Sequence, residues 1–199
     1  MPALSRTDLD PDPIAQFHAW YELASEQVPL ADAMTLASVD ADGAPDARMV
    51  LLKGFGADGF RFFTNLDSAK ASQMAARERV ALIIFWRELD RQVRIRGAVS
   101  RLDEQASDEY FASRPRESQI GAWASPQSRA IEDRAALEAR VAEIENRFDG
   151  EDVPRPPRWG GYVVAPTVIE FWQGQVGRLH DRFAYTRGAG RWAIERLAP

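Results

Sequence analysis

Three side chains that can carry positive charge follow one another at intervals of two residues near the end of the chain. They are Arg178, His180 and Arg182. If residues 179–186 form a strand, all three side chains leave the same face of it. Neighbouring positive groups repel one another unless an anion or an electron-rich group lies opposite. The pattern therefore favours a site for an anion or a polar ring, and a solvated strand face is the alternative.

Two further groups of residues have the chemistry to bind phosphate. Tyr110 and Arg114 share one face of a predicted helix and Ser118 follows, so a phenol, a guanidinium and a hydroxyl are available for charge-assisted hydrogen bonds. Arg48 and Lys53 flank an apolar stretch and lie an odd number of residues apart, so on a strand they face opposite sides and could serve two anionic ligands. The alternatives are a solvated helix end and two cations that reach water.

Several other chemistries are excluded by residue type and context. The chain has no cysteine, so disulfides, thiolate metal sites and cysteine nucleophiles are absent. Its two histidines, His18 and His180, are far apart in the sequence, and we expect no metal site. Gly54, Gly56 and Gly59 match a dinucleotide-binding pattern, but a strand-like run follows them where that fold needs a helix. These glycines therefore predict a hairpin turn.

The composition is that of an ordinary globular protein. The chain has 199 residues, 45% of them hydrophobic and 28% charged, with a net charge of −5. It has no long block of like charge, so we expect no nucleic-acid partner. No apolar run approaches the ~20 residues of a membrane span, and the acidic N-terminus does not resemble a secretory signal. We expect a cytoplasmic protein with no membrane partner.

Hydrophobic spacing then predicts the elements that must position these residues. Helices are expected at 14–24, 68–77, 103–113 and 130–148. Strands are expected at 34–40, 47–55, 60–65, 79–86, 92–102, 161–164, 167–173, 179–186 and 192–197. Short strands with mostly hairpin connections predict a mainly β fold, an antiparallel and Greek-key-like barrel with flanking helices. We expect a single domain over 1–199, with 1–12 as a flexible lead-in.

Longer motifs carry a resemblance to a known family. They include Ser-Arg-Pro-Arg-Glu-Ser-Gln-Ile-Gly at 113–121 and Arg-Leu-His-Asp-Arg at 178–182. The matching segments, in order, are 48–53, 63–66, 88–93, 110–123, 159–161, 169–174, 178–182 and 196–199. On these residues the chain resembles the pyridoxine/pyridoxamine 5′-phosphate oxidase family, the FMN enzymes of vitamin B6 synthesis and salvage. The resemblance covers roughly residues 14–199.

The resemblance implies an FMN-binding split β-barrel that forms a homodimer, with two FMN sites at the subunit interface. It implies that Arg48 and Lys70 hold the FMN phosphate, and that Arg178 and His180 act as catalytic residues that hold the substrate ring against the flavin. The substrate phosphate would be clamped by Lys53, Tyr110, Arg114 and Ser118. The residues implied to bind the cofactor, some from the partner chain, are Arg48, Met49, Val50, Leu51, Leu52, Lys53, Phe63, Thr64, Lys70, Gln92, Gln127, Ser128, Trp172 and Arg182.

The implied reaction is the oxidation of pyridoxine or pyridoxamine 5′-phosphate to pyridoxal 5′-phosphate. A hydride leaves the substrate C4′ for flavin N5, and O₂ reoxidises the flavin to give H₂O₂. With the amine, the resulting imine hydrolyses and releases ammonia. The alternatives are a related flavin oxidase acting on phenazine-type rings and a non-catalytic protein that binds FMN or pyridoxal phosphate.

The sequence departs from the family pattern in two places. Ala69 precedes Lys70, where family members often have arginine, so we expect one fewer charge-assisted contact to the FMN phosphate. The family's basic, tyrosine-containing N-terminal arm has no match, since residues 1–12 are acidic. We therefore expect a less complete closure over the substrate.

Overall fold

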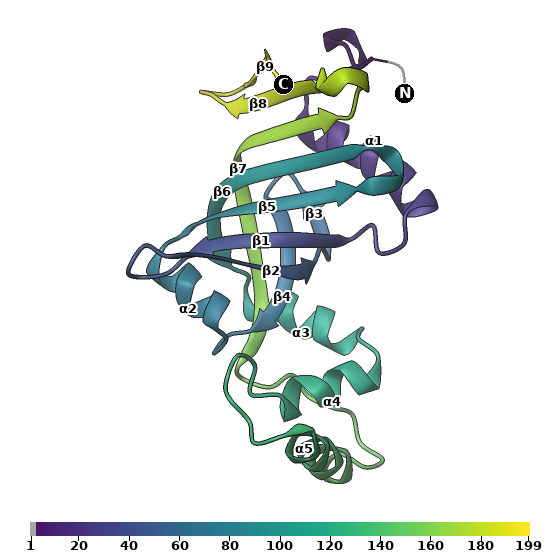
Figure 1. Cartoon of the computed structure of the whole chain (residues 1–199). Coiled ribbons are helices and arrows are strands. Elements are labelled where there is room, and N and C mark those ends of the chain that lie inside the picture. Colours follow the sequence, from purple (N-terminus) through teal and green to yellow (C-terminus); the bar gives the residue numbers. More distant parts are fainter. Residues whose placement is uncertain (1–2) are drawn as a thin grey trace.

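The framework of the protein is one antiparallel sheet that curls into a half-barrel (Figure 1). The computed structural model describes residues 3–199, and this part of the chain contains nine strands. They are β1 Ala33–Val39, β2 Pro45–Leu51, β3 Gly54–Gly56, β4 Gly59–Asn65, β5 Arg79–Trp86, β6 Arg91–Arg101, β7 Trp159–Gln173, β8 Asp181–Arg187 and β9 Trp192–Leu197. The strand order is β2-β1-β5-β6-β7-β4-β3, and β8 joins β7 to β9. The predicted antiparallel split barrel is confirmed.

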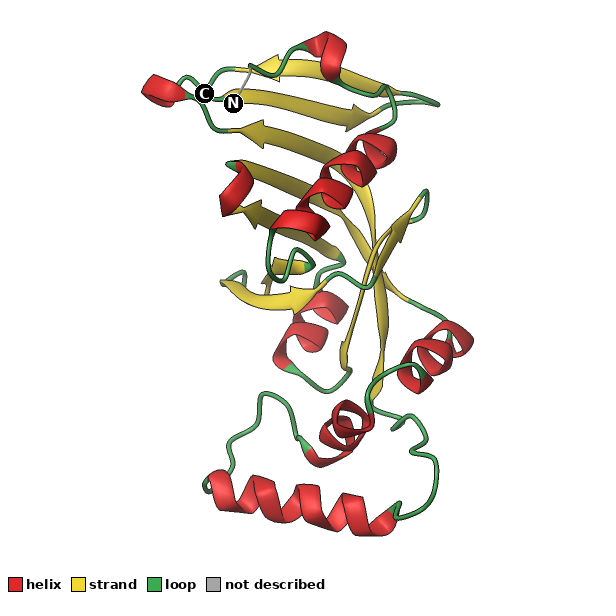
Figure 2. Ribbon diagram, turned by 90° about the vertical axis from the view of Figure 1, so that its right-hand side faces the viewer, coloured by secondary structure: helices red, strands yellow, loops and turns green. Residues whose placement is uncertain are grey.

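Five α-helices flank the sheet in the described residues. They are α1 Pro13–Gln27, α2 Ala69–Ala76, α3 Glu104–Ala112, α4 Arg116–Ala124 and α5 Arg134–Arg147. The last three gather at the end of the sheet opposite β8 and β9 (Figures 1 and 2). Four of the helices were predicted, but α4 was not. Its segment follows Pro115, which stops α3 and then stands directly before the first turn of α4, a position that proline tolerates.

Two hydrophobic clusters hold these layers together. In the larger one, Phe17 of α1 is fully buried and makes edge contacts with Phe55 and Phe60 of the β3–β4 hairpin. The smaller cluster lies at the helical end and includes Phe111, Ile120 and Trp159. The helical end therefore has its own core, which fixes α3 and α4 against the start of β7.

β7 runs through Pro166, where the sequence predicted two separate strands. One edge of β7 pairs with β4 over 159–164 and then with β8 over 168–173. Pro166 lies in the gap between these two ladders, and the register with β6 shifts at Arg96/Gly97 opposite it. Proline has no backbone N–H, but no strand of the described residues pairs with β7 at Pro166 on that edge. No hydrogen bond between strands is therefore lost there, and the strand continues.

Two of the predicted strand limits were wrong near residues that matter for function. The stretch 47–55 divides because β2 ends at Leu51 and a separate short strand, β3, starts at Gly54. The parity argument for Arg48 and Lys53 fails with it, since Lys53 lies outside both strands. The strand predicted over 179–186 begins only at Asp181.

That second difference overturns the argument that Arg178, His180 and Arg182 share a strand face. Arg178 ends a short 3₁₀ turn, Val176–Arg178, with a left-handed φ of 62°, and His180 precedes β8. Only Arg182 lies on the strand. Leu179, which lies between Arg178 and His180, is 72% exposed.

Residues from Leu4 onward contact the barrel, and the expectation that 1–12 is a flexible lead-in stays a prediction. Leu4 and Leu9 are buried, and the Tyr185 hydroxyl donates a hydrogen bond to the carbonyl of Asp10 at 2.7 Å. The described N-terminal segment therefore packs on the barrel. The assignment of 1–199 to a single domain stays a prediction.

The described residues contain neither a candidate membrane span nor a metal-binding group of side chains. Across residues 3–199, no helix is both long enough and apolar enough to cross a membrane. In the same residues, no group of three or more histidine or carboxylate side chains could hold a metal ion.

The β3–β4 hairpin gives a test of the fold. Gly59 has a φ of +131°, and a Cβ there would overlap the carbonyl of Val164. We expect Gly59→Ala to lower the free energy of unfolding by about 1–3 kcal/mol or more, measured by urea denaturation. Gly43→Ala is the control, because its φ of +93° carries the same kind of backbone cost with no atom within 4 Å of the added Cβ. Equal losses in the two variants would show that the overlap with Val164 has no effect.

Candidate functional site

A cavity of about 440 Å³ lies where β2, β4 and the start of β7 meet α3 and α4. This volume is within the usual range for small-molecule sites. The residues predicted from the sequence that line it are Met49, Val50, Leu51, Lys53, Phe63, Thr64, Lys70, Tyr110, Arg114, Ser118 and Gln127. Segments far apart in the chain therefore converge on one pocket.

Lys70 lies in this cavity and forms no ion pair with a carboxylate of the described residues. Its ammonium donates to Gln127 Oε1 at 2.8 Å and to Thr64 Oγ1 at 3.2 Å, and Ser68 Oγ lies at 3.4 Å. Burial lowers the pKa of Lys70, and the nearby charge of Arg48 lowers it further. A buried cation that is surrounded by neutral oxygens favours an anion beside it.

Arg48 lies next to this group but does not line the cavity. Its guanidinium donates hydrogen bonds to Ser38 and Gln73 and forms an ion pair with Asp46. Arg48 is therefore already paired within the chain, whereas Lys70 is not paired with any acid in the described residues. Of the two predicted phosphate ligands, Lys70 is the one whose charge is open to a ligand.

A second cation, Arg114, lies elsewhere on the wall of the cavity. Its guanidinium lies 4.8 Å from the Trp159 ring and 5.5 Å from the Phe111 ring. Its Nη1 is buried and has no hydrogen-bond partner, and burial lowers its pKa. An unsatisfied buried donor costs about 1–3 kcal/mol, so this nitrogen is suited to an acceptor brought by a ligand.

Three aromatic rings support this end of the cavity. Phe63 stacks on Tyr110 with 4.1 Å between the ring centres, and on Trp159 at 5.3 Å. Arg114 in turn covers Trp159. The stack therefore fixes both the phenol and the guanidinium. Lys53 also lines the cavity and is paired with Asp32 at 2.7 Å.

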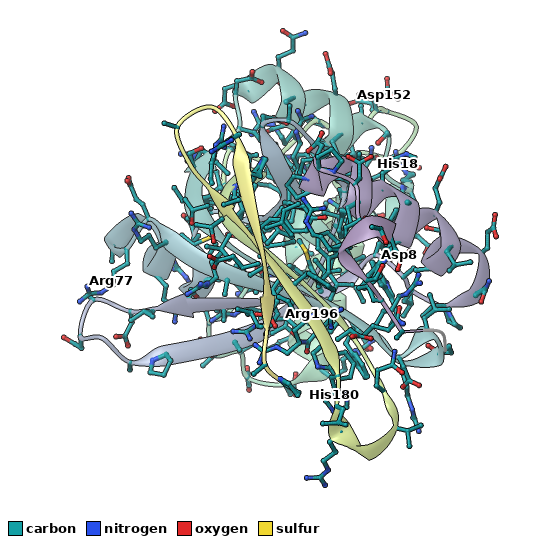
Figure 3. All side chains as sticks on the ribbon, turned by 90° about the horizontal axis from the view of Figure 1, so that it is seen from above. Asp8, His18, Arg77, Asp152, His180 and Arg196 are labelled. Carbon is teal, nitrogen blue, oxygen red and sulfur yellow. The ribbon has the colours of Figure 1, made fainter. Side chains whose placement is uncertain are left out.

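The other predicted site residues gather at the opposite end of β7. Gln92 of β6, Trp172 of β7 and Arg182 of β8 are direct neighbours across the sheet, so their side chains share one face. The His180 ring lies 4.6 Å from Trp172, and Figure 3 shows it at the outer edge of the molecule. Arg182 is held by Glu170 at 2.9 Å.

These two groups of residues are far apart in a single chain. Trp159 borders the cavity and Trp172 lies with His180, and the stretch of β7 between them corresponds to roughly 40 Å of extended strand. Figure 1 shows the two ends of β7 beside α3 and beside β8. One chain therefore does not bring Arg178, His180 and Arg182 to the cavity. Leu52, also predicted, is buried in the core, and Ser128 lies outside the cavity lining.

Sequence reasoning missed five residues that line the cavity. They are Asn65, Gly121, Ala122, Ser125 and Trp159. Gly121, Ala122 and Ser125 were missed because helix α4 and its C-terminal end were not predicted. Asn65, Gly121, Ala122 and Trp159 lie in segments quoted for the resemblance, so membership of these segments was the signal that could have found them.

Two family models match the chain. Residues 22–148 match the family described as pyridoxamine 5′-phosphate oxidase. Residues 159–199 match the pyridoxine 5′-phosphate oxidase C-terminal dimerisation region. Together they cover both the cavity and the far end of β7.

Curated relatives with this name resemble the chain over nearly its whole length. The pyridoxine/pyridoxamine 5′-phosphate oxidase of Cupriavidus metallidurans is 54% identical, covering 99% of this chain and 93% of the relative. The protein of the same name from Burkholderia thailandensis is 53% identical, covering 99% and 94%.

Solved structures confirm the fold. PhzG from Burkholderia lata 383, in complex with tetrahydrophenazine-1-carboxylic acid, is 30% identical with a TM-score of 0.93 and covers 100% of this chain and 99% of its own. A pyridoxamine 5′-phosphate oxidase-related, FMN-binding protein from Nostoc punctiforme has a TM-score of 0.76 at 19% identity, covering 96% and 100%. The chain therefore belongs to the pyridoxamine 5′-phosphate oxidase family of flavin-dependent oxidases.

Proposed function

We propose that this protein is an FMN-dependent oxidase that converts pyridoxine and pyridoxamine 5′-phosphate to pyridoxal 5′-phosphate. The observation that carries the proposal is one cavity with two separate cations open to ligands, Lys70 and Arg114. FMN and a B6 phosphate each bring one phosphate. Relatives that are more than half identical carry the name of this activity.

The residues around Lys70 fit the FMN phosphate. Lys70 supplies the charge, Thr64 and Gln127 supply polar groups beside it, and Arg48 adds a second positive charge nearby. Met49, Val50 and Leu51 of β2 line the cavity next to them and are placed to contact the flavin ring. FMN, when bound, supplies the hydride acceptor and passes the electrons on to O₂.

The substrate phosphate fits the group around Arg114. Its unpartnered Nη1 can donate to a phosphate oxygen, and Tyr110, Ser118 and Lys53 are further donors that line the same cavity. A phosphate there would satisfy the buried nitrogen. The contribution of these residues to the reaction is to bind and orient the substrate.

The substrate ring is assigned to Arg178 and His180 of a second copy of the chain. The long separation along β7 keeps these residues away from their own cavity. The outer side of the β1–β2–β5 region also exposes Leu30 (74%), Met49 (62%) and Phe85 (53%), as an interface between copies would. We therefore propose a homodimer in which each site takes its cavity from one chain and Arg178, His180, Trp172 and Arg182 from the other.

The experiment that tests this function is an anaerobic titration of the flavin-loaded protein. We expect pyridoxine 5′-phosphate to bleach the flavin absorbance, and readmitted O₂ to restore it with release of pyridoxal 5′-phosphate and H₂O₂. Steady H₂O₂ release also excludes a carrier without turnover. A protein that binds FMN and stays yellow with both B6 phosphates would contradict the proposal.

A second candidate function has one observation in its favour. The PhzG structure, solved with a tetrahydrophenazine carboxylic acid, matches the whole chain at a TM-score of 0.93. The B6 assignment is preferred because the relatives named for it are 54% and 53% identical, against 30% for PhzG. Bleaching by a reduced phenazine carboxylate and not by B6 phosphates would reverse this order.

Lys70 gives a prediction about the cofactor. We expect Lys70→Met to weaken FMN binding roughly tenfold to a hundredfold, because it removes a charged donor from the phosphate. Fluorescence titration of flavin into the apoprotein measures this. Arg77→Met, which follows the same helix α2 and whose side chain bonds to Asp40 and Ala41 on the surface, is the control. Unchanged FMN affinity in Lys70→Met would remove Lys70 from the phosphate site.

A further inference from the structure

Asp181 lies at the centre of a hydrogen-bond network between the two ends of the chain. This first residue of β8 is buried. Its Oδ2 accepts from the backbone N–H of Leu4 and from Gln175 Nε2, each at 2.9 Å. Its Oδ1 accepts from Arg196 Nη1 at 2.6 Å, and the other guanidinium nitrogen of Arg196 donates to the Leu4 carbonyl at 2.7 Å. The Asp181 carboxylate thus joins the N-terminal segment, β9 and Gln175 in the connection between β7 and β8.

The carboxylate is ionised in this setting. Burial acts to raise the pKa of Asp181, but hydrogen bonds from Arg196, Leu4 and Gln175 outweigh it, and the pKa lies below its usual value. All three groups around it are donors. The ionised carboxylate can accept from all three, since both of its oxygens are acceptors.

The network lies at the end of the connection between β7 and β8, which contains Arg178 and His180. Its start is fixed by the Gly174 N–H, which donates to the Asp90 carbonyl at 2.7 Å. Its middle is exposed and contains two successive left-handed residues, Gly177 (φ 70°) and Arg178 (φ 62°). A non-glycine residue in that conformation is strained and persists only where the surroundings hold it.

The network reaches His180 through Gln175. The Gln175 side chain is bound by Asp181, and its backbone N–H donates to His180 Nδ1 at 3.2 Å. A ring nitrogen that accepts carries no proton, so a neutral His180 has its proton on Nε2. Asp181 thus fixes the residue that sets both the orientation and the tautomer of the His180 ring.

We infer that Asp181 is a positioning residue for the Arg178–His180 connection, and that the segment beginning at Leu4 is part of this support. The inference rests on the proposed function for its effect on turnover. It assigns a role to the N-terminal segment other than covering the substrate. The segment supports Arg178 and His180 through the Asp181 carboxylate, which does not contact the ligand.

Histidine NMR tests the inference without any turnover. The chain has only two histidines, His18 and His180, so ¹⁵N-histidine labelling gives two ring systems, and His18 on α1 is an internal control. In the unaltered protein we expect His180 with its proton on Nε2. In Asp181→Ala we expect a loss of this single tautomer, with His18 unchanged. Asp181→Asn should fall between them, because an amide offers one acceptor oxygen where the carboxylate offers two.

Two shortened chains test the N-terminal part and remain informative if Asp181→Ala does not fold. A chain that begins at Leu4 keeps a donor beside Asp181, whereas one that begins at Arg6 loses it. We expect only the second to change the His180 tautomer. We also expect it to lower kcat/KM by up to about a hundredfold, the scale of a 1 Å misplacement, with the flavin retained.

The outcomes separate this inference from the proposed function. If the unaltered protein oxidises no B6 phosphate, the proposed function fails, and the NMR comparison still decides the role of Asp181. If Asp181→Ala and the chain that begins at Arg6 both keep the Nε2 tautomer of His180, Asp181 is not its positioning residue. A fall in flavin binding equal to the fall in turnover would also overturn the inference, since it would indicate general damage.

Discussion

Replacing Arg114 by alanine is expected to raise the KM for pyridoxine 5′-phosphate by about thirtyfold to a few thousandfold while the flavin stays bound. The range corresponds to about 2–5 kcal/mol for the loss of one partner of a buried charge pair. Arg114 is held over Trp159 and has a buried Nη1 with no partner among residues 3–199, so a phosphate oxygen is the acceptor that it lacks. Steady-state kinetics with pyridoxine 5′-phosphate measures the change.

The comparison that makes this result specific uses pyridoxine without its phosphate. Its KM should change little in Arg114→Ala, so the preference for the phosphorylated substrate should largely disappear. Arg61→Ala is the matched control, because Arg61 also has a buried nitrogen without a partner but pairs with Asp58 and does not line the cavity. An equal rise in KM for both substrates would contradict the assignment of Arg114 to the phosphate.

Local sequence signals were sufficient for the parts of the fold that depend on local physics. The turn at Gly56–Gly59 was predicted because a strand-like run follows the glycines, and β3 does pair with β4 there. The first helix was predicted from its apolar spacing, and its cap is Asp12, which accepts from the Ile14 N–H. Both features are decided by neighbours in the sequence.

The errors arose where tertiary structure outweighs local pattern. Alternation could not show that β8 begins at Asp181, because the preceding turn is held by Leu4 and Arg196 from the two ends of the chain. Two strands, 161–164 and 167–173, were predicted in place of β7. Pro166 between them needs no ladder bond on one edge of β7 because of where β4 and β8 stop pairing. Neither fact is encoded near the residue concerned.

The candidate site shows the same division. Tyr110, Arg114 and Ser118 were predicted as phosphate ligands from residue types and helical spacing, and all three line the cavity. Two features could be seen only in the folded chain. No acid of the described residues pairs with Lys70, and Arg114 lies against the Trp159 ring. No spacing rule shows that His180 lies at the far end of the sheet from them.

Mixing two impaired variants, assayed at a pyridoxine 5′-phosphate concentration far below the KM of Arg114→Ala, tests whether the site is shared between chains, and the expected effect is large. Arg114→Ala damages the cavity, and His180→Ala damages the ring-binding end. Each is expected to lose most of its activity as a pure dimer. In a mixed dimer, one site receives both changes and the other receives neither, because its cavity and its His180 come from the two undamaged halves. Random reassociation should therefore restore about a quarter of the unaltered activity, given closed two-fold symmetry.

The recovery distinguishes a shared site from a site within one chain. If each chain supplied its own cavity and its own His180, every site in the mixture would carry one of the two changes and no activity would return. Mixing Arg114→Ala with Lys70→Met is the control, because both residues line the same cavity and a mixed dimer has no undamaged site. Recovery with His180→Ala and none with Lys70→Met would require the two ends of β7 to meet across the dimer. The geometry predicts recovery with His180→Ala, since roughly 40 Å of strand separates the two ends of β7 within one chain.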